Sequence, residues 1–302
     1  MRHATAAMTK RTALAFPILL AACASPPTGR PVAPPAATAP GRTPAPTGPT
    51  EFVLRGEPRQ GGALHGTVPA GTRSLSLDGT ALPFDADGRF LIAFDRDAPP
   101  VAVLQAVRAD GATLERRLAV RPGAWRIEHV DASPTGGVTS AEFRARRAGE
   151  LERITAARAV NARSGGWRQN FGWPLAGRVS GLFGAQRIYR GTPGSYHSGI
   201  DIAARAGTPF VAAAAGVVVL AAQRPFTLEG HLLIVDHGMG LTSAFLHCAS
   251  LALREGDAIV RGQVLGTVGA SGRATGPHLH WGLVWRGARV DPLLVAGDMP
   301  SP

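Results

Sequence analysis

The chain contains few cysteines, tyrosines and lysines. Its 302 residues include two cysteines, two tyrosines and a single lysine, Lys10. Two cysteines cannot build the disulfide framework of a small secreted domain. The apolar run near the N-terminus, residues 12–22, has 11 residues, whereas a helix needs about 20 to cross a bilayer. The sequence therefore predicts neither a disulfide-stabilised fold nor a membrane-spanning helix in this run.

Several motifs of common enzyme classes are also missing. No HExxH helix is present, which excludes a thermolysin-type zinc site, and no GxSxG is present. The glycine-rich turns of residues 269–276 lack the lysine of a phosphate-binding loop. The formal net charge of +11 favours anionic polymers or headgroups as partners. Because no RNA- or DNA-binding motif accompanies that charge, we do not expect nucleic acid as a partner.

The N-terminus has the pattern of an export signal. Basic residues precede the apolar run, which ends in Leu20-Ala-Ala-Cys23. This ending resembles the lipobox of bacterial lipoproteins, in which the cysteine becomes the lipidated first residue. We therefore expect residues 1–22 to be a signal peptide and Cys23 to carry a membrane anchor. An ordinary signal peptide with a chance cysteine is the alternative. Ala24, in place of aspartate, resembles sorting to the periplasmic face of the outer membrane.

Residues 23–50 are predicted to form a tether. Nine prolines lie between Pro26 and Pro49, and such a segment favours extended polyproline II over a packed core. At about 3.1 Å per residue, it could hold a folded body away from a membrane surface. A disordered linker without a spacing role is the alternative interpretation.

Residues 51–130 are predicted to form a small β-domain. Three Asp-Gly pairs, at residues 78–79, 87–88 and 110–111, are typical of hairpin turns. The segments Phe90–Phe94 and Val101–Val107 between them have the composition of strands. This spacing of short strands predicts an immunoglobulin-like sandwich.

Residues 139–160 are predicted to form a connecting helix. The segment Thr139–Glu142 fits a capping box, and Arg146 and Glu150 are oppositely charged and four residues apart. The apolar residues of this segment recur at helical spacing, and they are Phe143, Leu151 and Ile154. We expect this stripe to pack against one of the β-regions.

Residues 167–296 return to a β pattern. Short apolar segments separated by glycines predict strands at residues 217–221, 232–235 and 264–268. The whole chain is thus predicted to be mainly β.

Six of the nine histidines fall between Tyr196 and Trp281. His278 and His280 are two residues apart, and side chains at that spacing on a strand point to the same face. His197 and Asp201 are four residues apart with a glycine between them. A catalytic zinc ion takes three protein ligands of this kind and leaves the fourth position to water. The stretch therefore predicts a zinc hydrolase site.

These motifs resemble those of the lysostaphin-type (LytM-like) zinc metallopeptidases. The family's HxxxD is His197–Asp201, and its HxH is His278–His280 within Gly-Pro-His-Leu-His-Trp. The DHG turn corresponds to Asp236–Gly238 and the following histidine to His247. The resemblance covers roughly residues 171–292. It implies an antiparallel β-sheet peptidase domain.

The resemblance also implies a role for each position. His197, Asp201 and His280 would bind Zn²⁺, and His247 and His278 would be the catalytic histidines. Zinc lowers the pKa of its bound water, and a nearby imidazole can accept the water proton or stabilise the oxyanion. Which histidine is the general base stays open.

Other polar residues near these motifs receive minor roles. Tyr189, expected in the loop before His197, is a possible oxyanion donor. His231, His237 and Tyr196 are expected to serve the fold. Cys248 is expected to be buried and to point away from His247.

The resemblance implies a zinc endopeptidase that hydrolyses peptide cross-links of peptidoglycan in the cell envelope. In a Gram-negative host, the bond would be a D-alanyl–diaminopimelate link. The alternative is a LytM-like regulator that binds the wall without hydrolysis, or is autoinhibited by the 139–160 helix or the β-domain, and that activates an amidase. That alternative would require a protein partner.

Overall fold

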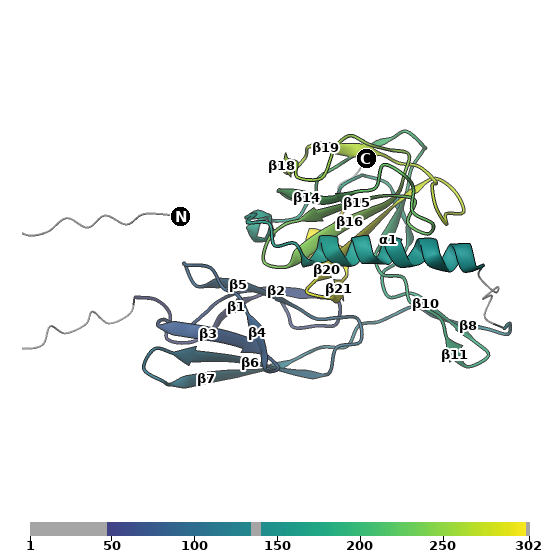
Figure 1. The fold of residues 1–302 in the computed structure, drawn as a ribbon. Helices are drawn as coiled ribbons and strands as arrows, with labels where there is room; N and C mark the ends of the chain where they lie inside the picture. The colour runs from purple at the N-terminus through teal and green to yellow at the C-terminus, as the bar shows by residue number, and fades with distance from the viewer. Residues whose placement is uncertain (1–46, 134–139, 300–302) are drawn as a thin grey trace, which may run out of the picture. The chain divides into compact units, whose positions relative to one another are not determined.

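The computed structural model describes residues 47–133 and 140–299 (Figure 1). The predicted signal peptide, Cys23 and the tether up to residue 46 lie outside the described residues. Within the two described ranges, no helix is long and apolar enough to cross a membrane.

The N-terminal region contains two antiparallel sheets (Figure 1). The three-stranded sheet has the order β1-β2-β5, with strands Val53–Arg55, Ala63–Thr67 and Arg89–Ala93. The four-stranded sheet has the order β4-β3-β6-β7, with strands Thr80–Leu82, Thr72–Leu77, Val101–Arg108 and Thr113–Ala119. The predicted β character is confirmed, and the immunoglobulin-like topology stays a prediction.

The Asp78-Gly79 turn shows why the sequence signalled hairpins here. Both residues have positive φ angles, 49° and 77°, as the two central residues of a type I′ turn require. The turn joins β3 to β4, which pair in register from Leu77 and Thr80 outward. Asp78 also accepts a hydrogen bond from the Val103 backbone, at 2.7 Å, and so ties the turn to β6.

The C-terminal region is built on an eight-stranded antiparallel sheet. Its order is β18-β14-β15-β16-β20-β12-β9, and β21 pairs with β20 outside this path. The strands, in that order and then β21, are Ala258–Ile259, Gly216–Ala221, His231–Asp236, Leu241–Cys248, His278–Trp285, Ile200–Ala203, Arg178–Gly181 and Ala288–Val290.

Two smaller sheets complete the fold. One has the order β13-β19-β17, with strands Pro209–Val211, Val264–Thr267 and Ser250–Leu251. The other has the order β11-β10-β8, with strands Thr192–Pro193, Gln186–Tyr189 and Ile127–Val130. Because β8 pairs in parallel with β10, the chain's N-terminal and C-terminal regions share a sheet. The described residues, 47–133 and 140–299, belong to one compact unit.

The central sheet has two differently covered faces. Successive side chains on a strand alternate between faces. On one face Phe245 and Trp281 are fully buried, and Phe210 packs on Phe245 with ring centroids 5.3 Å apart. The opposite face carries Ala244 and His280, and it is partly covered by the long helix. The larger core lies on the first face, and a smaller apolar cluster that includes Ile154, Ile234 and Ala244 lies under α1 on the second.

Helix α1, Ala141–Ala159, packs against β14 and β15 through Ile154 and Ala157 (Figure 1). Its N-cap is Ser140, whose hydroxyl accepts from the Phe143 N–H at 3.1 Å; the predicted capping box was therefore wrong by one residue. The predicted stripe was also wrong at Leu151, which is 47% exposed. Glu150 is buried in its place, because polar partners outside the helix bind its carboxylate. Two short helices complete the structure, η1 Gly166–Arg168 and α2 Pro292–Ala296.

His237 is a buried structural histidine. Its Nδ1 lies 2.7 Å from the carbonyl oxygen of Ala215 and its Nε2 lies 2.7 Å from the Ser243 hydroxyl. The ring also packs edge-to-face on Phe171. Burial lowers the pKa of His237 to about 4, because the charged ring loses its hydration.

This shift predicts a pH dependence of stability. An unfolded histidine titrates near pH 6.5. Between about pH 6.5 and pH 4, His237 is therefore protonated in the unfolded chain and neutral in the folded protein. The contribution of His237 is present above pH 6.5 and is lost as the pH falls towards 4. We expect a loss of about 2 kcal/mol in unfolding free energy between pH 7 and pH 4.5, measured by denaturant unfolding.

The control compares two histidine variants. His237→Gln should remove this part of the pH dependence, whereas His129→Gln should keep it, because His129 is exposed on β8. An equal loss on acidification in native protein and His237→Gln would contradict the assignment.

Candidate metal centre

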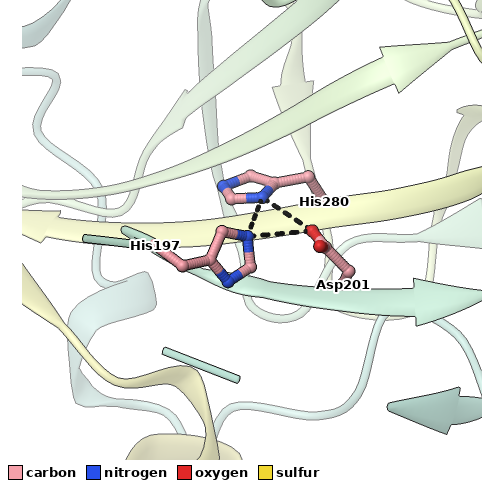
Figure 2. Close-up of side chains that lie close together, drawn as sticks. All are labelled: His197, Asp201 and His280. Atoms are coloured by element: carbon pink, nitrogen blue, oxygen red, sulfur yellow. Dashed lines mark hydrogen bonds and ion pairs between the residues drawn. The ribbon is translucent and has the colours of Figure 1, made fainter. Parts of the chain in front are cut away.

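The side chains of His197, Asp201 and His280 converge on one point (Figure 2). Nε2 of His197 lies 3.1 Å from Oδ1 of Asp201 and 3.0 Å from Nδ1 of His280. The third edge, between Nδ1 of His280 and Oδ1 of Asp201, is 2.9 Å. These three atoms form a nearly equilateral triangle of metal-ligating groups.

Strand pairing brings two members of the triangle together. Asp201 on β12 is paired directly with His280 on β20, so both side chains leave the same face of the sheet. His197 lies in the segment that leads into β12. A Cβ on Gly199 would collide with the carbonyl oxygen of Trp281 and with Nε2 of His280. Only glycine therefore allows the chain between His197 and Asp201 to approach β20 this closely.

The donor set fits zinc. Zinc binds imidazole nitrogen and carboxylate oxygen at about 2.0–2.2 Å, and tetrahedral geometry then places the donors about 3.3 Å apart. The observed edges of 2.9–3.1 Å are close to this spacing. Nδ1 of His197 lies 3.0 Å from the carbonyl oxygen of Leu182. A proton on Nδ1 would donate to that oxygen and leave the Nε2 lone pair for a metal.

The electrostatics of the triangle centre on Asp201. Burial opposes ionisation of this carboxyl, but hydrogen bonds and charge from His197 and His280 outweigh it and hold the pKa of Asp201 well below its usual range. Burial also opposes protonation of His197, yet the bond to Asp201 raises the pKa of His197. Burial lowers the pKa of His280. The triangle thus contains one firmly ionised carboxylate.

Two further histidines face the triangle. The rings of His247 and His278 have centroids 4.9 Å apart, and the His247 ring lies 6.3 Å from that of His280. Nε2 of His278 is 3.7 Å from Oδ1 of Asp201. The five residues of the HxxxD, HxH and β16 motifs therefore lie in one cluster.

An irregularity in β16 places His247 there. In this strand Phe245 faces the core and Leu246 pairs with His280, so regular alternation would direct His247 into the core. His247 has a left-handed φ of 62°, and the β15–β16 register shifts beside it. This backbone turn redirects the imidazole towards His278. Strained backbone of this kind is typical of functional sites.

The comparisons with known proteins agree with this geometry. Residues 195–292 match the model described as Peptidase family M23. The peptidoglycan DD-endopeptidase ShyA of Vibrio cholerae is 34% identical over 125 residues, which are 41% of this chain and 29% of ShyA. A lipoprotein NlpD/LppB homolog of Pseudomonas aeruginosa is 35% identical over 129 residues, 43% of this chain and 39% of the relative. The chain thus spans well under half the length of these relatives.

Residues 195–292 are therefore similar to an M23 peptidase domain. A crystal structure from Pseudomonas aeruginosa assigned to peptidase M23 matches with a TM-score of 0.61 and 29% identity. The match covers 80% of this chain and 96% of that one. The structural match therefore extends well beyond residues 195–292 and includes residues of the preceding β-region.

Helix α1 is tied to the loop that supports His247 in the M23-like region. Arg147 donates to both carboxylate oxygens of Glu229, at 2.6 and 2.7 Å. The carbonyl oxygen of Glu229 accepts from the His247 N–H at 2.8 Å. Glu150 accepts from the backbone and the hydroxyl of Thr227, at 2.7 Å each. The sequence did not reveal this network, because its members are about 80 residues apart in the chain and nothing local signals their contact.

Two cavities flank the metal-ligand triangle of the M23-like region. A cavity of about 910 Å³ includes His197, Tyr189 and Arg273 in its lining. A cavity of about 190 Å³ between α1 and the sheet includes His280. The triangle therefore lies between one large and one small space.

The remaining sequence assignments can now be placed. Tyr189 is the last residue of β10, not part of a loop, and it lines the large cavity; a role as oxyanion donor stays a prediction. His231 has Nδ1 3.0 Å from the carbonyl oxygen of Ala222. Tyr196 donates to Asp95 at 3.2 Å. Cys248 is fully buried, as predicted, and burial raises its pKa to about 12.

Proposed function

We propose that the protein is a zinc-dependent endopeptidase that hydrolyses peptide cross-links of peptidoglycan. The observation that carries this proposal is the convergence of two histidines on a His–Asp–His metal-ligand triangle within an M23 domain. His197, Asp201 and His280 would hold the ion through Nε2, Oδ1 and Nδ1. When bound, zinc would polarise the scissile carbonyl and lower the pKa of its water.

His247 and His278 would act in proton transfer and in stabilising the oxyanion. Nδ1 of His247 lies 2.9 Å from the carbonyl oxygen of Ser271, and Nδ1 of His278 lies 2.8 Å from that of Gly276. Donation to these oxygens leaves Nε2 of each neutral ring as a proton acceptor. One imidazole can take the proton of the attacking water, and the other, when protonated, can stabilise the developing oxyanion.

The relatives support peptidoglycan as the substrate. ShyA is named a peptidoglycan DD-endopeptidase, and a relative from Neisseria meningitidis is named a DD-carboxypeptidase/endopeptidase. One relative is a lipoprotein homolog, which accords with lipidation of Cys23 and a place at the periplasmic face of the outer membrane. All five motif positions are filled here, which favours an enzyme over a regulator without activity.

Incubation with cross-linked sacculi tests the proposal. Purified full-length protein with zinc should convert dimeric muropeptides to monomers, and His280→Ala should reduce this conversion at least 100-fold, because one of three ligands is lost. His129→Ala is the matched control, since its exposed ring lies on β8. The proposal fails if native protein loaded with zinc leaves the dimers intact, or if His280→Ala cleaves as well as native protein.

A further inference from the structure

The small cavity beside His280 is closed on one side by α1. Gly282, Ala244 and Leu246 of the sheet form its floor, and Ile154 of α1 contributes to its wall. Ser198 and His280 bring it next to the metal-ligand triangle. Its volume of about 190 Å³ is that of roughly six water molecules in the liquid, at about 30 Å³ each. The cavity is therefore of a size for a single residue, whereas the 910 Å³ cavity on the other side can take a longer chain.

The lining of the small cavity has excess positive charge. Three arginines and one glutamate contribute to it, and they are Arg147, Arg158, Arg289 and Glu229. The carboxylate of Glu229 is already engaged by Arg147 through both oxygens. Within residues 47–133 and 140–299, the structure gives neither Arg158 nor Arg289 a salt bridge to a carboxylate. Arg289 lies over the Tyr196 ring, 5.1 Å from its centroid, and Glu229 only partly offsets the charge of Arg158, so neither guanidinium has a carboxylate of its own.

The positive charge of Arg289 also affects Arg158. Burial, followed by the positive charge of Arg289, lowers the pKa of Arg158, and Glu229 only partly offsets this. Like charges that approach in a partly desolvated space repel one another, and an anion between them would relieve that repulsion. Guanidinium groups also match carboxylates in shape, because they can donate two parallel hydrogen bonds.

We propose that this cavity is a carboxylate subsite, in which Arg158 and Arg289 bind the free carboxylate on the carbon that bears the scissile amide nitrogen. The inference rests on the proposed function. The substrate's longer part then lies in the large cavity, and the residue released as an amine lies under α1. The same carboxylate occurs in two sources: the C-terminal residue of a peptide, and a cross-link made through a diaminopimelate amine whose carbon carries a carboxylate.

Two pairs of synthetic substrates test the subsite with the full-length zinc-loaded protein. The first is N-acetyl-D-Ala-D-Ala and its C-terminal amide. The second is N-acetyl-D-Ala joined to the D-centre amine of meso-diaminopimelate, with the D-centre carboxylate free or amidated. We expect kcat/KM of native protein to be at least 10-fold higher for the free carboxylate than for the amide. The carboxylate can form charged hydrogen bonds with the two arginines, whereas the neutral amide leaves their charge uncompensated. Comparing the pairs identifies which source is used.

Arginine variants assign the preference to the cavity. Arg158→Gln and Arg289→Gln should each reduce the preference to less than 3-fold while cleavage of the amides stays near the native rate. Arg116→Gln makes the same charge change on exposed β7 and should keep the native preference. Equal melting temperatures of the variants exclude misfolding as the cause, and Arg158→Lys, which keeps the charge, should retain part of the preference.

A binding measurement separates this inference from the proposed function. Calorimetry with D-alanine and D-alaninamide requires no hydrolysis. Tighter binding of D-alanine that is lost in Arg158→Gln would support the subsite even if no peptide is cleaved, and the endopeptidase proposal alone would then fail. Cleavage without preference between free and amidated carboxylates in native protein, or an unchanged preference in both arginine variants, would overturn the subsite and leave the proposed function intact.

Discussion

Asp201→Asn is expected to weaken zinc binding at least 100-fold. Asp201 supplies the only negative charge among the three ligand atoms, and its pKa is held well below the usual range. The amide keeps the size of the side chain but removes the charge that offsets a divalent cation. Competition with a fluorescent chelator measures the affinity. Zinc at 100 times its dissociation constant should also stabilise the native fold by about 2.7 kcal/mol, and at the same zinc concentration this gain should fall to about 0.4 kcal/mol or less in the variant.

The same substitution at Asp131 provides the control. Asp131 forms an exposed ion pair with Arg190, and its own side chain is 94% exposed. Asp131→Asn should therefore bind zinc as native protein does. Native affinity in Asp201→Asn would contradict the assignment of this carboxylate as a ligand. A loss of affinity supports the assignment only if circular dichroism shows that the metal-free variant is folded.

Arg147→Met is expected to lower the unfolding free energy by about 3 kcal/mol and to slow hydrolysis. Arg147 bridges two carboxylates, Glu150 and Glu229, and its side chain is only 17% exposed. Removing it leaves both carboxylates without their shared cation in a poorly hydrated place, and losing one partner of a buried pair costs about 3–5 kcal/mol. The lower end applies because solvent still reaches the pair. Denaturant unfolding measures the loss.

Arg147→Met would slow hydrolysis because it disturbs the position of His247. Glu229 accepts the His247 N–H with its carbonyl oxygen, so release of the Glu229 side chain should loosen the segment that holds His247. We expect a lower kcat for muropeptide cleavage with little change in zinc affinity. Amide hydrogen exchange should also show faster exchange at His247.

Arg146→Met is the matched control for this variant. Arg146 immediately precedes Arg147 on the same helix, its side chain is 62% exposed, and it contacts Glu150 at 3.3 Å. An exposed pair contributes about 0–1 kcal/mol, so the loss should stay below 1 kcal/mol and kcat should be unchanged. Equal losses in the two variants would show that the helix surface, not the link to Glu229, determines the result.

The sequence determined the elements that depend on neighbouring residues. Asp-Gly pairs favour left-handed backbone, so the turn at Asp78-Gly79 could be predicted. The spacing of His278 and His280 placed both on one face of a strand. The complete HxxxD and HxH motifs predicted the grouping that the structure shows. The family match, at residues 195–292, includes both motifs.

Only the tertiary structure decided what depends on distant partners. The φ of 62° that redirects His247 breaks the strand alternation on which sequence reasoning relies. Glu150 is buried, and Leu151 beside it exposed, because Thr227 and Arg147 bind the Glu150 carboxylate. The docking of α1 beside His280, which creates the small basic cavity, depends on contacts about 80 residues apart. Local patterns determine which residues can form a strand or helix, but the energy of burying a charge depends on which distant groups the fold places around it.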